Sequence, residues 1–152
     1  EIAEVLETSQ AAARQTLSRA QRAVQAALDG DAQARRTRDA AALAALAQAV
    51  MAGDVSAVVA LLAPGSTLHS DGGGLVSAAL RPVLGSDKVA RLLLGLATRP
   101  DLTVEPVTVS GGAGFLILEA GVLTTVMTAR TGPDGIQELY MLRNPERLPR
   151  VR

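Results

Sequence analysis

Four strand-like segments, separated by glycine-containing turns, restrict the fold of this chain more than any other feature. They run over residues 102–109, 113–120, 122–130 and 136–143. The turns between them contain Gly111-Gly112, Gly121 and Gly132-Pro133-Asp134-Gly135. Turns this short join neighbouring antiparallel strands, and a Pro-Asp-Gly turn is a strong hairpin signal. The sequence therefore predicts four consecutive antiparallel strands.

Three amphipathic segments precede these strands, and each has a capping residue before its apolar residues. Asp39, Asp54 and either Ser86 or Asp87 are expected to cap the three helices. Gly53 ends the first helix. The residues expected to face inward are Leu43, Leu46, Ala47, Val50, Val55, Val58, Leu61, Leu62, Val89, Leu92, Leu93 and Leu96. Helices followed by antiparallel strands predict an α+β fold, in which a curved sheet wraps the helices and buries one face.

A run of three glycines lies between the second and third predicted helices. It follows a short strand predicted over residues 67–70, and residues 75–80 are expected to form the returning strand. Glycine takes backbone angles closed to other residues, so both a loose hairpin and a close contact with another segment remain open. In the sheet, the side chains expected to face the helices are Leu116, Leu118, Leu123, Met127, Leu139 and Met141.

The composition excludes several classes of function. The formal net charge is +0, so no global electrostatic field favours nucleic acid or a membrane. The absence of cysteine excludes disulfides and thiolate chemistry, and it fits a reducing cytoplasm. No metal-ligand spacing, phosphate-binding loop or nucleophile motif is present, so neither a metal nor another cofactor is expected. Because the chain opens at Glu1 within a helical pattern, we expect it to be a fragment of a longer protein.

The first segment carries a short helical pattern, a break at residues 7–9, and then a longer amphipathic helix that Ser9 can cap. Ala13, Leu17, Ala20, Val24 and Leu28 form the apolar stripe of that helix, and its other face is rich in Arg and Gln. This arrangement is typical of a helix-turn-helix, whose second helix enters the DNA major groove. A solvated amphipathic helix is the alternative.

Residues 1–20, EIAEVLETSQAAARQTLSRA, resemble the end of region 4 in bacterial extracytoplasmic-function sigma factors. The family's typical wording there is EIAEVLG-S-AAVRQ-LSRAR. The resemblance implies that the second helix recognises the promoter −35 element. Two departures are Glu7, where the family has a turn glycine, and Ala13, where it has valine. The implied DNA-binding residues are Gln10, Ala11, Arg14, Gln15, Ser18, Arg19 and Arg22.

Residues 30–38 lack apolar periodicity and contain three arginines, and Gly30 is expected to end the preceding helix. They are predicted to be a solvated linker, or else a basic strip that touches DNA phosphate or polymerase. The predicted domains are therefore a helix-turn-helix remnant over 1–29, a linker over 30–38 and an α+β domain over 39–152.

The α+β plan of residues 39–152 is that of the cone-shaped nuclear-transport-factor-like domains, which include the SnoaL-like proteins. Residues 70–74 and 144–148, SDGGG and NPERL, resemble the DGGGK and NPDKL motifs of sigma factors that carry a C-terminal SnoaL-like domain. Leu75 replaces the motif lysine, so it cannot make a contact that needs a positive charge. The predicted regulatory contact residues are Asp71, Gly72, Gly73, Gly74, Asn144, Pro145, Arg147 and Leu148.

The resemblance implies part of a cytoplasmic sigma factor that binds core RNA polymerase and promoter DNA, and whose fused domain regulates its activity without being an enzyme. That domain would contact the sigma regions outside this chain, and a homodimer is a further expectation. The alternative is a small-molecule-binding, isomerase-like or hydrolase-like cone, with His69, Glu119 and Tyr140 around a pocket. In that reading, His69 and Asp71 could form an acid–base pair.

Overall fold

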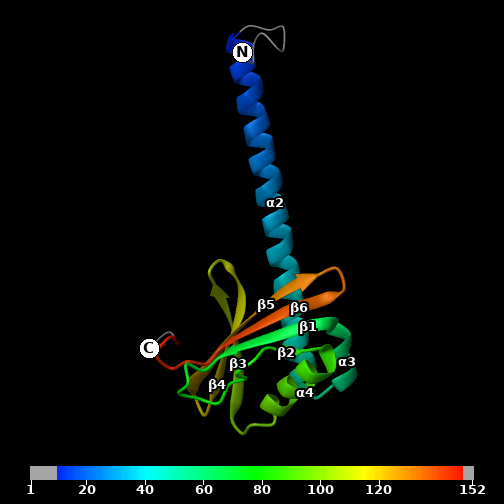
Figure 1. Cartoon of the computed structure of the whole chain (residues 1–152), viewed down its shortest axis with the longest axis vertical. Coiled ribbons are helices and arrows are strands. Elements are labelled where there is room, and N and C mark those ends of the chain that lie inside the picture. Colours follow the sequence, from blue (N-terminus) through cyan, green and yellow to red (C-terminus); the bar gives the residue numbers. More distant parts are fainter. Residues whose placement is uncertain (1–9, 149–152) are drawn as a thin grey trace. The chain divides into compact units, whose positions relative to one another are not determined.

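The computed structural model describes residues 10–148, and the chain divides into two compact units, Glu1–Arg35 and Arg36–Arg152 (Figure 1). The residues expected to form the first short helix, its turn and the Ser9 cap lie outside the described range. Within that range, no helix combines the length and the apolar character needed to cross a membrane.

Helix α2 (Gln10–Met51) is a single helix of 42 residues. The expectation that Gly30 ends one helix and that Asp39 begins another is wrong. Alanine, arginine and glutamine dominate this segment, and their high helix propensity outweighs a single glycine, which costs about 1 kcal/mol relative to alanine. The predicted domain boundaries at residues 29 and 38 remain predictions.

The Arg36–Arg152 unit contains one six-stranded sheet with the order β2-β1-β6-β5-β4-β3. The four strands predicted at the end of the chain are confirmed, and each pairs antiparallel with its neighbour in sequence. They are β3 (Leu102–Val109), β4 (Gly112–Glu119), β5 (Val122–Gly132) and β6 (Gly135–Leu142). Strand β1 (Leu62–Asp71) pairs in parallel with β6, so the sheet is mixed.

Two short helices complete this unit, α3 (Val55–Leu61) and α4 (Ser86–Ala97). The Asp54 cap is confirmed, because its carboxylate accepts a hydrogen bond of 2.9 Å from the backbone N–H of Ala57. The predicted cap of α4 is wrong. Gly85 occupies the cap position, at φ 94°, and no side chain caps this helix.

The strand predicted to return after the glycines is absent from the described structure. Residues 75–80 form no strand, and β2 (Val83–Leu84) pairs with β1 instead. The chain folds back at Gly72, whose carbonyl accepts hydrogen bonds from the N–H groups of Leu75 and Val76 at 3.1 and 3.3 Å. A turn this tight directs the chain away from the edge of β1.

The core lies between the helices and one face of the sheet. It includes Leu43 and Leu46 of α2, Val58 of α3, Val89 of α4 and Leu139 of β6, each at most 1% exposed. The expected inward residues Leu116, Leu118 and Leu123 are not part of it, whereas Phe115 and Ile117 pack against it. Val55, also expected inside, is 56% exposed. Residues 115–118 are all apolar, so the sequence could not indicate which alternate set faces inward.

Candidate functional site

Two turns that are far apart in the sequence meet beside the end of β1, and we call residues 71–75 and 144–148 the turn-pair surface. Asp71 connects them through both its side chain and its backbone. Its carboxylate accepts a hydrogen bond from the N–H of Gly73 (2.9 Å) and forms an ion pair with Arg147 (3.2 Å). Its carbonyl accepts a hydrogen bond of 2.7 Å from the N–H of Arg143. The structure thus brings together the two segments predicted to form a regulatory contact.

Gly73 is the point of closest approach within the turn-pair surface. It has φ 62°, and a Cβ atom there would lie 2.3 Å from the Nδ2 atom of Asn144. Asn144 is only 7% exposed, and its Oδ1 accepts a hydrogen bond of 3.0 Å from the N–H of Glu146. Only glycine leaves room for this amide. Of the two alternatives for the glycine run, a loose hairpin and a close contact with another segment, the structure shows the close contact.

The exposed part of the turn-pair surface has mixed character. Leu75, at the position of the motif lysine, is 58% exposed. Pro145, Glu146 and Arg147 are also exposed, and the side chain of Arg147 is 71% exposed although it pairs with Asp71. The surface therefore presents an apolar side chain beside two acidic groups, Asp71 and Glu146, and one basic group.

The predicted DNA-binding residues all lie in α2. Gln15, Ser18, Arg19 and Arg22 are exposed, and Arg22 Nε donates a hydrogen bond of 3.2 Å to the Ser18 carbonyl. Gln10, Ala11 and Arg14 also lie in the helix, but their side chains are not among those that the structure describes. On the apolar stripe of the same helix, Val24 is 60% exposed and Leu28 is 59% exposed.

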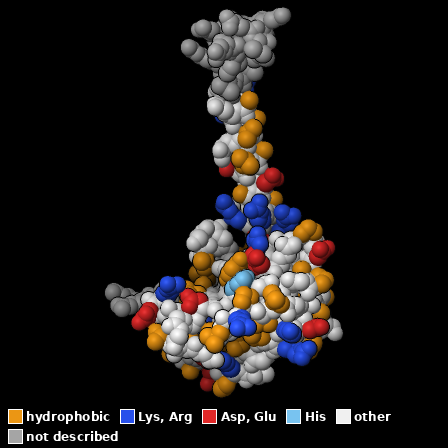
Figure 2. Space-filling model, viewed as in Figure 1, with side chains coloured by type: hydrophobic (Ala, Val, Ile, Leu, Met, Phe, Trp, Pro, Cys, Tyr) orange, Lys and Arg blue, Asp and Glu red, His pale blue; other side chains and the backbone are white. Residues whose placement is uncertain are grey.

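The three residues expected to surround one pocket are divided between the two faces of the sheet. His69 stacks on Tyr140, with ring centroids 5.1 Å apart and planes inclined by 12°. Tyr140 is 43% exposed, whereas the next residue, Met141, is in the core. Since neighbouring strand residues point to opposite faces, this stacked pair lies on the outer face. Figure 2 shows the histidine (pale blue) on a surface where acidic and basic side chains are interspersed.

Tyr140 also belongs to a polar cluster on that face. Its hydroxyl donates a hydrogen bond of 2.6 Å to Glu138, whose carboxylate also forms a 2.7 Å ion pair with Arg130. The hydrogen bond from Tyr140, followed by the charge of Arg130, lowers the pKa of Glu138. The same hydrogen bond raises the pKa of Tyr140. His69 and Asp71 form no acid–base pair, because Asp71 is engaged within the turn-pair surface.

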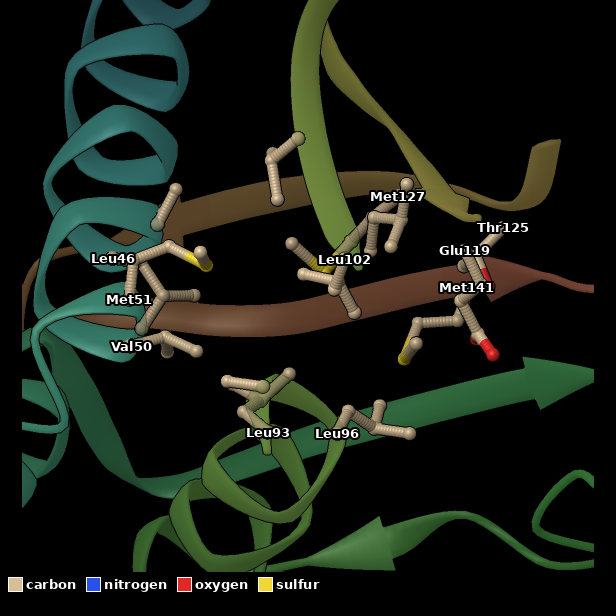
Figure 3. Close-up of a pocket in the computed structure, with 14 residues that line it drawn as sticks. Leu46, Val50, Met51, Leu93, Leu96, Leu102, Glu119, Thr125, Met127 and Met141 are labelled. Carbon is tan, nitrogen blue, oxygen red and sulfur yellow. The ribbon is translucent and has the colours of Figure 1, made fainter. Parts of the chain in front are cut away.

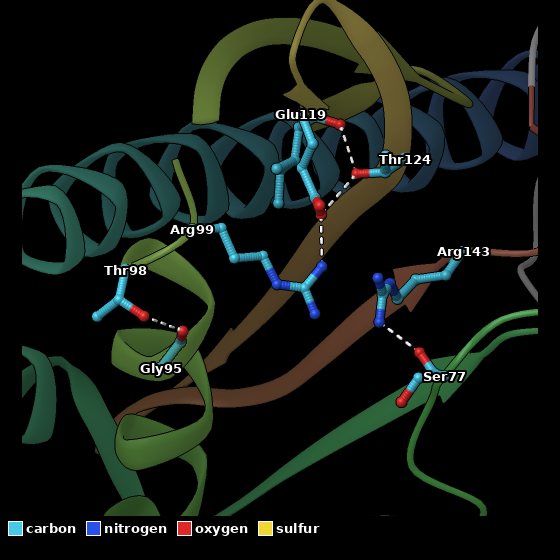
Figure 4. Close-up of polar contacts among 8 residues, drawn as sticks. Ser77, Gly95, Thr98, Arg99, Glu119, Thr124 and Arg143 are labelled. Carbon is cyan, nitrogen blue, oxygen red and sulfur yellow. Dashed lines mark hydrogen bonds and ion pairs between the residues drawn. The ribbon is translucent and has the colours of Figure 1, made fainter. Parts of the chain in front are cut away.

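Glu119 lies on the inner face, at an apolar cavity of about 50 Å³ between α2, α4 and the sheet (Figure 3). Its carboxylate pairs with Arg99 at 2.6 Å and accepts a hydrogen bond of 3.2 Å from the hydroxyl of Thr124 (Figure 4). The cavity is lined by Leu46, Ala47, Val50, Met51, Leu93, Leu96, Ala97, Leu102, Val104, Ile117, Glu119, Thr125, Met127 and Met141. Among the described residues, no cluster of His, Cys, Asp or Glu could hold a metal ion.

Comparison with known proteins finds one curated relative along almost the whole chain. The sequence is 40% identical over 144 residues to the ECF RNA polymerase sigma factor SigJ of Mycobacterium tuberculosis. The chain is therefore similar to an extracytoplasmic-function sigma factor along almost its whole length. The aligned part is 91% of this chain and 43% of SigJ, so the chain spans less than half the length of its relative. No protein-family model matches the sequence.

Comparison with solved structures also finds similarity to SigJ, and it identifies the fold. The crystal structure of M. tuberculosis SigJ matches 95% of this chain and 52% of its own, with a TM-score of 0.61 and 30% identity. An NTF-2-like protein of unknown function from Burkholderia xenovorans LB400 matches 76% of this chain and 91% of its own, with a TM-score of 0.53 and 18% identity. The second match shows the fold alone. The α+β cone of the nuclear-transport-factor-like and SnoaL-like proteins, predicted from the sequence, is confirmed.

Two arginines at the inner face, Arg99 and Arg143, carry no clear functional signal in the sequence. Arg99 was seen only as part of a helix end, and Arg143 only as the end of a strand, although both reach the inner face beside Glu119. The position of Arg143 directly before the NPERL motif is the one signal that could have drawn attention to it. No local signal indicates Arg99.

Proposed function

We propose that this chain is part of an RNA polymerase sigma factor in which the SnoaL-like domain regulates transcription initiation. The observation that carries the proposal is the turn-pair surface. Its two segments bear the motifs of the sigma-factor subgroup. Asp71 joins them through its ion pair with Arg147 and its backbone hydrogen bond from Arg143. Gly73 lies against Asn144. In the longer protein, this surface would contact the sigma regions that lie outside this chain. Core RNA polymerase and promoter DNA would be the partners, and the cytoplasm would be the location.

The first part of α2 would supply the contact with promoter DNA. Arg19 and Arg22 are exposed and can hold phosphates, and Gln15 can read a base edge. The exposed stripe with Val24 and Leu28 would pack against the other helices of sigma region 4. Covalent connection keeps the turn-pair surface at high effective concentration near the other sigma regions, so even weak contacts are mostly formed.

Transcription with the intact protein tests this proposal. We expect deletion from Asp39 onward to change promoter-dependent transcription by core polymerase. Arg147→Ala, which removes an exposed side chain of the turn-pair surface, is expected to change it in the same direction. The matched control is Arg91→Ala, which removes an exposed arginine of α4. Equal transcription from the intact and truncated proteins would count against regulation.

A non-enzymatic role is part of the proposal. The enzyme alternative relied on His69, Glu119 and Tyr140 acting together, but His69 and Tyr140 stack on the face opposite Glu119. It predicts that His69→Ala abolishes turnover of a cavity ligand. We further propose that a second copy of this chain covers the outer face of the sheet.

A further inference from the structure

A second hollow in the Arg36–Arg152 unit lies beside the apolar cavity and contains two arginines. Its volume is about 210 Å³, and it shares Leu96 and Met141 with the apolar cavity. Arg99, which follows α4, and Arg143, which follows β6, both line it. Figure 4 shows the two guanidinium groups on the same side of the sheet, near Glu119. We call this hollow the two-arginine pocket.

The charges in the two-arginine pocket do not balance. Arg99 has an acidic partner, because its Nη1 lies 2.6 Å from the Glu119 carboxylate. Within residues 10–148, Arg143 has no ion pair with a carboxylate. Its Nη1 donates a hydrogen bond to the Ser77 carbonyl, and its buried Nε has no hydrogen-bond partner there. Two positive groups therefore face one negative group, and one further negative charge would neutralise the pocket.

The partly buried charge of Arg143 is unfavourable in this environment. Burial, followed by the positive charge of Arg99, lowers the pKa of Arg143. A charged group withdrawn from water loses hydration that only an opposite charge or hydrogen bonds can replace. A bound carboxylate would supply both to a guanidinium, whose planar fork fits the two carboxylate oxygens.

The other walls of the two-arginine pocket are mostly apolar. Leu68 of β1, Leu92 and Leu96 of α4, and Met141 of β6 line it, while Ser70 and Ser77 add polar groups. At about 30 Å³ for each water molecule, the volume corresponds to about seven waters. This is enough for a small organic molecule but not for a peptide or a nucleotide.

We propose that the two-arginine pocket binds a small organic monocarboxylate. Its acid group pairs with Arg143, and its apolar body lies against Leu92 and Leu96. A single negative charge matches the single unpaired arginine, since Glu119 already neutralises Arg99. The site is separate from the stacked pair of His69 and Tyr140, and this binding is additional to the proposed role in transcription.

Titration of the full chain with hexanoate and with hexanol, followed by calorimetry, tests the proposal. Hexanol has the same apolar body but no charge. We expect hexanoate to bind and hexanol to bind at least about tenfold more weakly, because charge-assisted hydrogen bonds carry most of the discrimination. Arg143→Gln should weaken hexanoate binding about tenfold or more by the same argument. Arg91→Gln, an exposed arginine on α4, should leave it unchanged.

Absence of hexanoate binding, equal binding of hexanol, or full affinity in Arg143→Gln would overturn the proposal. Leu96→Phe separates loss of the site from loss of the fold, because it fills the apolar part and keeps both arginines. With the far-ultraviolet circular dichroism unchanged, weaker hexanoate binding in Leu96→Phe supports the proposal, and unchanged binding contradicts it. No transcription is measured, so the outcome is independent of the proposed function.

Discussion

At the scale of single residues, substitutions at two neighbouring glycines of the turn-pair surface distinguish the cost of backbone strain from the cost of losing a specific contact. Gly73 and Gly74 have similar positive φ values, 62° and 74°. A Cβ on Gly73 would lie 2.3 Å from the Asn144 amide, whereas nothing lies within 4 Å of one on Gly74. Either residue changed to alanine therefore carries the left-handed backbone penalty of about 1–2 kcal/mol. Only Gly73→Ala also displaces Asn144.

We therefore expect Gly73→Ala to lower the free energy of unfolding by more than Gly74→Ala does. The additional loss should be about 1–3 kcal/mol, the cost of leaving buried polar groups without partners. Urea unfolding of both variants measures the difference. If the turn-pair surface is regulatory, Gly73→Ala should also change transcription by the intact protein more than Gly74→Ala does. Equal stability of the two variants would show that Asn144 moves aside without cost.

The ionisation of Tyr140 on the outer face can be followed directly, because Tyr140 is the only tyrosine in the chain. The hydrogen bond to Glu138 raises the pKa of Tyr140, so its phenol should ionise at higher pH than an unperturbed tyrosine. Its contribution to stability is present below the pKa of tyrosine in the unfolded chain, and it is lost as the pH rises through the folded-state pKa. Absorbance of the phenolate during alkaline titration follows the change.

Glu138→Gln should lower the midpoint of that titration, because the hydrogen bond from Tyr140 to a charged acceptor is lost and a neutral amide no longer repels the phenolate. Glu146→Gln is the control, since this exposed carboxylate lies in the turn-pair surface and should leave the midpoint unchanged. A midpoint that is the same in wild type and Glu138→Gln would mean that the hydrogen bond does not persist in solution.

At the scale of elements, Asp39 connects α2 to the hairpin of β5 and β6. Its Oδ1 accepts hydrogen bonds from the N–H and the hydroxyl of Thr131, at 2.7 and 2.6 Å. Asp39→Ala should lower the free energy of unfolding by about 1–3 kcal/mol, since it leaves a partly buried N–H without a partner. Asp31→Ala, on an exposed part of the same helix, should change it by less than about 0.5 kcal/mol. Urea unfolding that ranks the variants otherwise would contradict this role.

The sequence predicted best those elements whose signals are local. Glycine-containing turns delimit β3 to β6, and Asp54 caps the helix that follows it directly. Asp39 was also predicted to be a cap, but its partner is Thr131, 92 residues away. No local pattern contains that pairing, and the same holds for the parallel pairing of β1 with β6.

The candidate site was predictable to the extent that it rests on short motifs. The two turns were assigned a common role from their motifs, and the structure places Gly73 against Asn144. The expected pocket was not predictable, because it depends on which face of the sheet each side chain occupies. An alternating pattern would have indicated the face, but residues 115–118 are apolar at every position. The side chains of Arg99 and Arg143 meet only through the tertiary fold.

At the scale of the whole molecule, the two faces of the sheet differ in how they are covered. Helices cover the inner face, and no described helix packs on the outer face. Leu116, Val126 and Leu142 lie side by side across β4, β5 and β6 on that outer face, by register and alternation. Glu105 of β3 continues the row as the cross-strand partner of Leu116. Leu116 and Leu142 are half-buried in this row, and Val126 between them is only 8% exposed.

We expect a second copy of this chain to bind this row, because symmetric homodimers are the commonest protein assemblies. Leu116→Lys should convert the dimer to a monomer, since it places a charge within the apolar row. The monomer should remain folded, because the new lysine lies opposite Glu105 and opposite charges across a strand pair are favourable. Sedimentation equilibrium measures the mass, and Leu84→Lys, an exposed change on β2, is the control that should stay dimeric. A wild-type chain that is monomeric throughout the concentration range would contradict the proposed dimer.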